Sequence, residues 1–169
     1  MKKSIIALAL TLAATSVSAI ELDIANFGNV EKADTSVIIG YGSLHFDSWS
    51  HEHLNEVNPS IGLEMWDISV VYVSKNSWED TSFYITYSPE IFESKYLDIS
   101  LDMGIATGYH QDATIVSNGV EYYHDNEFLN SAGIIPLVGV TAKAKITEYF
   151  SANLTITPAV AMFSTSFNF

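Results

Sequence analysis

Hydrophobic and polar residues alternate along much of this chain with a period of two. In residues 97–109 the odd positions are mostly leucine, isoleucine and methionine, whereas the even positions are first acidic or hydroxylic and then small. The same alternation runs through 81–88 and 150–157. A strand with one apolar and one polar face is typical of an antiparallel sandwich or barrel. No uninterrupted apolar run after residue 20 is long enough to predict a membrane-spanning helix.

The pattern predicts eight strands joined by connections on alternating sides. The strands are expected at 35–47, 60–66, 68–76, 81–88, 97–109, 132–142, 150–157 and 160–169. An even number of strands returns both chain ends to the periplasmic side. The outer loops are then 48–59, 76–80, 110–131 and a tight link near Pro158, and the periplasmic turns are 66–68, 89–96 and 143–149.

Strand length and the end of the chain favour a membrane barrel over a soluble sandwich. Segments of about ten residues with aromatic residues near their ends are typical of outer-membrane barrels. The final residues, "FSTSFNF", place Phe163, Phe167 and Phe169 on one face. This ending is similar to the signal that the barrel-assembly machinery recognises. We therefore predict an all-β fold, an eight-stranded antiparallel transmembrane β-barrel of the outer membrane, over 35–169.

The first residues predict export from the cytoplasm. Residues 1–19 combine a start containing Lys2 and Lys3, an apolar core, and small residues before Ile20. This three-part pattern is typical of a cleaved secretory signal peptide. Residues 20–34 are then a short N-terminal periplasmic segment, and the expected location is the bacterial outer membrane, with several membrane crossings.

Composition narrows the functions that this exported chain can have. After removal of 1–19 the chain keeps all 20 acidic residues and five lysines, a formal charge of −15, and it has no arginine. Such a charge leaves no electrostatic footprint for nucleic acid. Cysteine is absent, which excludes disulfides and thiolate metal sites. The "HEH" run at 51–53 has two histidines at i and i+2 but no clear third ligand, so we predict neither a metal nor a cofactor.

The polar faces of the strands raise the question of a cavity. The even positions of 97–109 face inward in the predicted barrel, with Asp98 and Asp102 in the periplasmic half and Gly104, Ala106 and Gly108 in the outer half. Small side chains leave room for a slender ligand in the outer half. The alternative is that large residues from other strands fill the space, because eight strands enclose little more than their own side chains.

Several short motifs, in order from Gly40 to Phe169, resemble the outer-membrane lipid A palmitoyltransferase family. They are "SLHFD" at 43–47, "NE" at 55–56, "SKNSW" at 74–78, "TGY" at 107–109, "IIPLVGV" at 134–140 and "TITP" at 155–158, followed by the aromatic final strand. Members of that family are eight-stranded barrels that move a palmitoyl chain from a phospholipid onto lipid A. The family carries an N-terminal amphipathic helix, but the segment before the barrel here is short, acidic and contains Gly28, so we do not expect a stable helix there, and the chain has no arginine, although the family uses basic residues near the headgroup region.

The resemblance assigns candidate site residues. It implies that His45 and Ser77 are essential and that Trp78 follows the serine as in the family. Asn76 stands where the family has an aspartate, and on this basis Asn76→Asp is expected to raise activity. Ser88 stands where a glycine forms the floor of the acyl-chain pocket in the family.

Two prolines add a second type of site. Pro136 lies inside a predicted strand, where it removes a ladder hydrogen bond, and Pro158 ends another. By resemblance, prolines at these positions flank a lateral opening through which the lipid donor enters the barrel.

The predicted function is transfer of an acyl chain from a phospholipid to lipid A or a related glycolipid, without a cofactor. His45 is a candidate base and Ser77 a nucleophile or an oxyanion donor. The expected partners are phospholipid, lipopolysaccharide and the barrel-assembly machinery, and we expect a monomer. One alternative is a non-catalytic barrel that binds lipid, mediates adhesion or protects the surface. A lipid A deacylase is disfavoured because no His-x-Ser pair occurs on a late strand.

Overall fold

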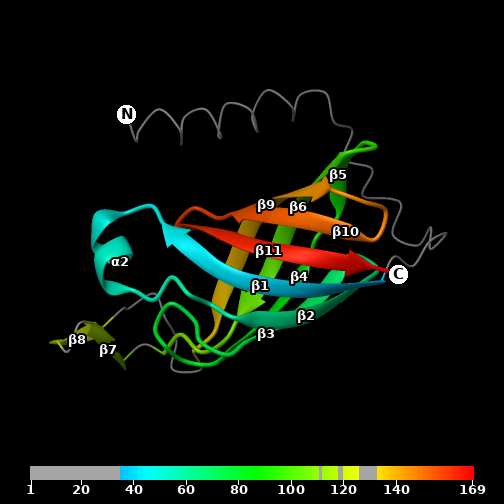
Figure 1. Ribbon diagram of the computed structural model, residues 1–169. Coiled ribbons are helices and arrows are strands. Elements are labelled where there is room, and N and C mark those ends of the chain that lie inside the picture. The colour runs from blue at the N-terminus through cyan, green and yellow to red at the C-terminus, as the bar shows by residue number, and fades with distance from the viewer. Residues whose placement is uncertain (1–34, 111, 118–119, 126–132) are drawn as a thin grey trace. The chain divides into compact units, whose positions relative to one another are not determined.

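Eight antiparallel strands form a closed barrel (Figure 1). The computed structural model describes residues 35–110, 112–117, 120–125 and 133–169. In ring order the strands are β1 (Thr35–His45), β2 (Ser60–Met65), β3 (Ile68–Val73), β4 (Ser82–Tyr87), β6 (Leu97–Ala106), β9 (Ile135–Lys145), β10 (Phe150–Ile156) and β11 (Val160–Asn168). The pairing of β1 with β11 joins the two ends of the strand series, and the pairing of β4 with β6 completes the ring. The predicted fold class is confirmed.

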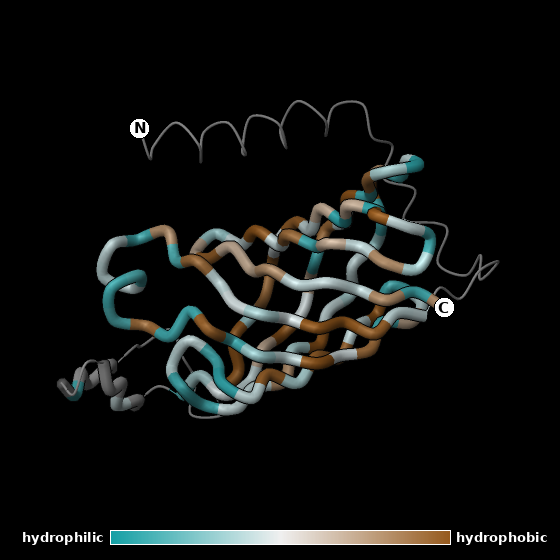
Figure 2. The backbone as a smooth tube through the Cα atoms, in the orientation of Figure 1, coloured by the Kyte–Doolittle hydropathy of each residue, from teal (hydrophilic) through white to brown (hydrophobic). Residues whose placement is uncertain are grey.

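The barrel wall is apolar outside and polar inside. Ile61, Leu63 and Val138 on the outer surface are 57%, 54% and 55% exposed, whereas Ser69 and Asp98 are buried inside. Figure 2 shows the resulting alternation of hydrophobic and hydrophilic residues along the strands. This is the inverse of a water-soluble fold, and it suits a wall surrounded by lipid. Among the described residues, no helix has the length and hydropathy needed to cross a membrane.

The sixth strand of the ring begins and ends three residues later than predicted. It was expected at 132–142, and β9 runs from Ile135 to Lys145. Lys143 was expected in the turn at 143–149, but it continues the inward face of β9 and forms an ion pair with Glu64 inside the barrel. The turn predicted at 143–149 therefore shortens to 146–149. The sequence alone does not distinguish a charged side chain that has a partner in the lumen from a charged side chain in a turn.

The predicted turn at 89–96 is also shorter than expected. Its first half contains β5 (Glu90–Glu93), which pairs with the start of β6 where β4 no longer reaches it. Pro89 separates β4 from β5, because a proline cannot donate to the ladder. The wall therefore continues past Ser88, and the chain reverses only at 94–96.

The long connections carry their own secondary structure. The first contains a short helix, α2 (Ser48–His53), capped by Asp47, whose Oδ1 accepts a hydrogen bond of 2.8 Å from the Ser50 amide. The third contains a hairpin of β7 (Asp112–Ser117) and β8 (Val120–Asp125). Figure 1 shows α2 at the opposite end of the barrel from the C-terminus. The predicted signal peptide and the segment 20–34 lie outside the described residues.

Candidate active site at the mouth of the barrel

His45 and Ser77 meet at one end of the barrel, although 32 positions separate them in the sequence. Nε2 of His45 lies 3.1 Å from Oγ of Ser77. His45 is the last residue of β1, and Ser77 lies in the loop between β3 and β4. We call this end the mouth; it is opposite to the end where Ser36 pairs with Asn168. The side chain of His45 is only 7% exposed, so the imidazole is held beside the hydroxyl rather than in open solvent.

Glu56 is the third member of this arrangement, and its role did not emerge from the sequence. Its Oε1 lies 2.8 Å from the His45 amide, 3.3 Å from His45 Nδ1 and 2.9 Å from His51 Nδ1. Burial raises the pKa of Glu56, but the hydrogen bonds from His51 and from the His45 amide and ring outweigh it, so the pKa lies below its ordinary value. The "NE" motif supplied the only sequence signal, and it gave Glu56 no chemical role.

The loop that carries Glu56 is bound to the loop that carries Ser77 through three successive carbonyl oxygens. The Asn58 side chain donates to the Lys75 carbonyl at 3.1 Å, and the Asn55 side chain donates to the Asn76 carbonyl at 3.0 Å. The Asn55 amide donates to the Ser77 carbonyl, also at 3.0 Å. These bonds fix the spacing between the carboxylate, the imidazole and the hydroxyl without using a charge.

Asn76 is fully buried and holds the serine loop together. Its Oδ1 accepts from the amides of Trp78 and Asp80, at 2.8 and 3.0 Å. Its Nδ2 donates to Ser82 Oγ at 2.7 Å and to the Gly108 carbonyl at 3.0 Å. A carboxylate here cannot make the two donations and would face the Gly108 carbonyl oxygen. We therefore expect the opposite of the sequence-based prediction: Asn76→Asp should lower activity.

Gly108 allows this close approach. Its φ is +80°, and a Cβ added there would lie 2.3 Å from the Thr81 carbonyl oxygen. Only glycine adopts this backbone readily and leaves room for the neighbouring loop. The "TGY" motif thus brings the end of β6 against the serine loop.

Tyr109, the next residue, places a hydroxyl beside the serine. Its hydroxyl lies 3.0 Å from the Tyr84 hydroxyl, and its side chain lines the same cavity as Ser77. Its ring also makes an edge contact with Trp78, with 5.4 Å between the centroids. The mouth therefore contains the His45 imidazole, the Ser77 hydroxyl and the Tyr109 hydroxyl. Sequence reasoning did not single out Tyr109.

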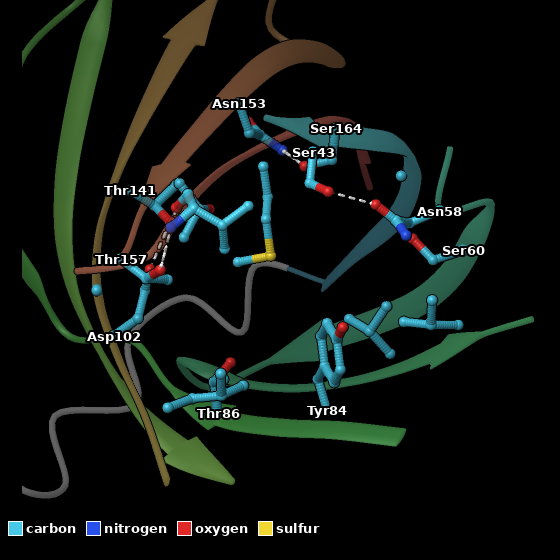
Figure 3. Close-up of a pocket in the computed structure, with 18 of the residues that line it drawn as sticks. Ser43, Asn58, Ser60, Tyr84, Thr86, Asp102, Thr141, Asn153, Thr157 and Ser164 are labelled. Carbon is cyan, nitrogen blue, oxygen red and sulfur yellow. Dashed lines mark hydrogen bonds between the residues drawn. The ribbon is translucent and has the colours of Figure 1, made fainter. Parts of the chain in front are cut away.

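Below the mouth the barrel is hollow. A cavity of about 780 Å³ extends into the lumen from His45, Ser77 and Trp78. Figure 3 shows side chains from several strands directed into it, among them Tyr84 and Thr86 of β4 and Asp102 of β6. Its lining also includes the small or apolar residues Gly40, Val71, Val73, Leu137, Gly139 and Met162. Large side chains do not fill this barrel, although Tyr84 occupies part of it.

Pro136 and Pro158 lie on the two sides of an open seam in the wall. The ladder between β9 and β10 ends with the pair Val140 and Ile156. In the described part of the chain, residues 135–139 of β9 have no register partner on the β10 side. The cavity lining includes Pro136 and Val138 on one side of this seam and Pro158 on the other. The hydrogen-bonded wall is therefore incomplete at a point where it borders the cavity.

Ser88 follows β4 and also lines the cavity. Its Oγ lies 3.5 Å from Thr86 Oγ1, and its amide donates to the Asp67 carbonyl at 2.7 Å. Because β5 extends the wall beyond it, Ser88 lies partway down the barrel. Its role as the floor of an acyl pocket stays a prediction.

An ion pair crosses the lumen near the end that carries Phe169. Nζ of Lys143 lies 2.9 Å from Oε1 of Glu64, and their strands, β9 and β2, are diametrically opposite in the ring. A second pair, Lys145 with Asp98 at 2.7 Å, lies alongside. We call the ion pair of Glu64 and Lys143 the inner bar, because it spans the lumen near the inner end of the barrel.

The histidines of "HEH" have separate partners. His51 contacts Glu56, whereas His53 Nδ1 lies 2.8 Å from the Trp49 carbonyl oxygen and its ring stacks on Trp49. Within the described residues no three His, Asp or Glu side chains are placed to hold a metal ion.

Comparison with known proteins bears on the fold of this chain and not on its chemistry. No family and no curated protein matches the sequence. The barrel is similar to a de novo designed transmembrane β-barrel (12% identity, 82% of this chain and 98% of the other, TM-score 0.56). It is also similar to the N-terminal β-barrel domain of OprF from Pseudomonas aeruginosa (16% identity, 81% and 98%, TM-score 0.50). Ail from Yersinia pestis matches at 10% identity over 82% and 100%, with a TM-score of 0.47. At these identities the likeness concerns the fold alone.

Proposed function

We propose that this chain is an outer-membrane acyltransferase that moves a fatty acyl chain from a phospholipid to lipid A or a related glycolipid. The observation that carries the proposal is the 3.1 Å contact between His45 and Ser77 at the mouth of a hollow barrel with an apolar exterior. A serine beside an imidazole is the arrangement of nucleophilic acyl transfer. The mouth also places the pair where a lipid headgroup meets water.

The proposed chemistry has two steps. Oγ of Ser77 attacks the carbonyl carbon of the phospholipid ester while Nε2 of His45 takes the hydroxyl proton. The ester bond then breaks, the lysophospholipid oxygen leaves with that proton, and the acyl group stays on Ser77. In the second step His45 takes a proton from an acceptor hydroxyl, which attacks the acyl carbonyl. The acyl–serine bond breaks, and the proton returns to Ser77.

The surroundings of Ser77 suit the charge that develops in both steps. The carbonyl oxygen becomes negative in each tetrahedral intermediate and needs a donor. The hydroxyl of Tyr109, which lines the same cavity as Ser77, is such a donor. Trp78 packs against the Tyr109 ring and so restricts where this hydroxyl points.

The seam and the cavity give the donor a path. The apolar outer surface places the wall in lipid, and the seam between Pro136 and Pro158 lets an acyl chain pass from the bilayer into the cavity. The chain then extends from Ser77 toward the inner bar. Lipopolysaccharide is the proposed acceptor, and the barrel-assembly machinery is the partner that inserts the C-terminal strand.

A reconstituted transfer assay tests this proposal. Purified protein in mixed micelles is given a phospholipid with an isotope-labelled acyl chain together with lipid A, and labelled lipid A is measured by mass spectrometry. We expect transfer by the wild type and none by His45→Ala, with both proteins showing the heat-modifiable gel migration of a closed barrel. Lipid A that stays unlabelled with folded wild type would instead support a non-catalytic, lipid-binding barrel.

A further inference from the structure

We propose that Glu56 is the positioning carboxylate of a Ser77–His45–Glu56 triad. The inference rests on the proposed role of Ser77 as a nucleophile. In such triads a carboxylate holds the imidazole in the tautomer that presents an unprotonated nitrogen to the serine. Asn76 lacks the charge for this task, and its amide is already used within the loop. The carboxylate must therefore come from elsewhere in the fold.

Glu56 has the geometry that the role requires. The two ring nitrogens of His45 face different partners: Nδ1 faces Glu56 Oε1 at 3.3 Å, and Nε2 faces Ser77 Oγ at 3.1 Å. When Nδ1 carries the proton, Nε2 is free to accept the serine proton. The same Oε1 also accepts from the His45 amide at 2.8 Å, so backbone and ring are aligned by one oxygen atom.

Hydrogen bonds between the loops fix the position of Glu56 beside His45. Its neighbour Asn55 is bonded to the Ser77 carbonyl, and Asn58 is bonded to the Lys75 carbonyl. The Glu56 carbonyl itself accepts from the Ser43 amide at 2.9 Å, two residues before His45. Glu56 is thus attached to the histidine strand by its main chain and its carboxylate, and to the serine loop through its neighbours.

His51 binds the same oxygen at 2.9 Å from the outer side. Its side chain is 54% exposed, whereas that of His45 is 7% exposed. His51 therefore orients the carboxylate from the solvent side and touches neither Ser77 nor the cavity in the described residues. It should be far less important than Glu56.

A serine-directed probe tests the triad without lipid substrates. A fluorophosphonate reacts when Ser77 Oγ attacks phosphorus, fluoride leaves, and His45 accepts the serine proton. We expect wild-type Ser77 to be labelled, as located by peptide mass spectrometry. Glu56→Gln keeps an oxygen acceptor but loses the charge, and its labelling rate should be at least about a hundredfold lower than that of the wild type. The matched control, Glu52→Gln in α2, should react at the wild-type rate.

A second pair of measurements separates positioning from a merely structural role. With p-nitrophenyl butyrate as substrate, Glu56→Gln should lower kcat strongly and change KM little. Glu56→Asp retains the charge with one methylene less and should recover most of the labelling rate, to within about tenfold of wild type. Heat-modifiable gel migration monitors the fold of each variant, and if Glu56→Gln does not fold, the split between kcat and KM in Glu56→Asp decides.

The outcomes separate this inference from the proposed function. The triad would be overturned if Ser77 of the wild type is not labelled, or if Glu56→Gln is labelled at the wild-type rate. It would also be overturned if Glu52→Gln loses as much labelling as Glu56→Gln, or if the loss in Glu56→Asp is confined to KM. Labelling that depends on Glu56 without any transfer to lipid A would keep the triad and reject the lipid acceptor. Transfer to lipid A that is unchanged in Glu56→Gln would keep the function and reject the role of Glu56.

Discussion

The two ends of the barrel differ in the contacts that join their parts. The mouth combines neutral amides with the Glu56 carboxylate beside His45 and His51, whereas the inner end relies on ion pairs. At the mouth, hydrogen bonds from the neutral amides of Asn55, Asn58 and Asn76 join the loops around Ser77. At the other end, ion pairs such as Glu64 with Lys143 join opposite strands across the lumen. Neutral amides fix a geometry without shifting the charge of a nearby base, whereas ion pairs place strong fields in the lumen. The mouth is thus suited to chemistry and the inner end to closure.

Removal of the proposed nucleophile should have the largest effect. Ser77→Ala should lower acyl transfer by about a thousandfold or more, because it removes the hydroxyl that lies beside Nε2 of His45. Ser74→Ala in the same loop is the matched control, since Ser74 Oγ donates to the Pro59 carbonyl at 3.0 Å. Transfer is measured with isotope-labelled donor. Equal activity in the two alanine variants would remove Ser77 from the mechanism.

The next largest effect should come from the amide that supports the serine loop. Asn76→Asp loses two hydrogen-bond donations and places a carboxylate beside the Gly108 carbonyl. We therefore expect the free energy of unfolding to fall by about 2–4 kcal/mol, and the activation free energy of transfer to rise by a similar amount. Denaturant unfolding in detergent and the transfer assay measure the two quantities. An aspartate variant more active than wild type would show that the loop needs charge rather than geometry.

The inner bar should affect stability rather than catalysis. Glu64→Gln leaves Lys143 without its partner in the lumen and should lower unfolding stability by about 1–3 kcal/mol, while Glu64→Met combined with Lys143→Met should restore most of it. Transfer of a short acyl chain should stay at the wild-type rate in both variants. Loss of transfer in the folded double variant would show that the two ends are coupled.

A smaller effect is expected on chain-length preference. Ser88 lines the cavity with a hydroxyl, so Ser88→Gly should shift the preferred donor toward chains longer by roughly one or two methylenes. Competition between donors of different length, read by mass spectrometry of the product, measures the shift. If the two profiles coincide, Ser88 does not limit the depth of the pocket.

Acid should remove the contribution of the Glu56 carboxylate to the stability of the mouth. The pKa of Glu56 is lower in the folded protein than its ordinary value, so the carboxylate adds stability above the unfolded pKa of about 4.3 and loses it as pH falls through the folded pKa. Wild type and Glu56→Gln should therefore differ in melting temperature near pH 6 and converge as the pH falls below the lowered pKa of the folded protein. A difference that persists at the lower pH would assign the stabilisation to contacts other than the carboxylate charge.

The sequence predicted the barrel well because period-two alternation is clear in several strands of the ring, such as 97–106 and 150–156. The predicted strand ends were wrong where a polar residue suits both a turn and a strand. Lys143 was expected in a turn but faces a partner in the lumen. Pro89 looked like the start of a turn, although β5 continues the wall beyond it. Alternation specifies which face a residue occupies, whereas the point where a strand ends depends on partners far away in the chain.

The site was only partly predictable for the same reason. His45 and Ser77 were identified by motif resemblance, and the structure brings them into contact. Glu56 and Tyr109 were not, since their roles depend on contacts made by loops of different strands. Asn76 looked like a damaged catalytic position, and only its four hydrogen bonds show it as a support for the loop.

The most direct test of the central claim is the mass of lipid A in living cells. Lipid A is extracted from bacteria that lack the protein, that express the wild type, and that express Ser77→Ala at equal levels in the outer membrane. The account predicts a lipid A species heavier by one fatty acyl group in the wild-type cells alone. Identical lipid A spectra from all three strains, with the folded barrel present in the membrane, would contradict acyl transfer to lipid A as the function of the mouth.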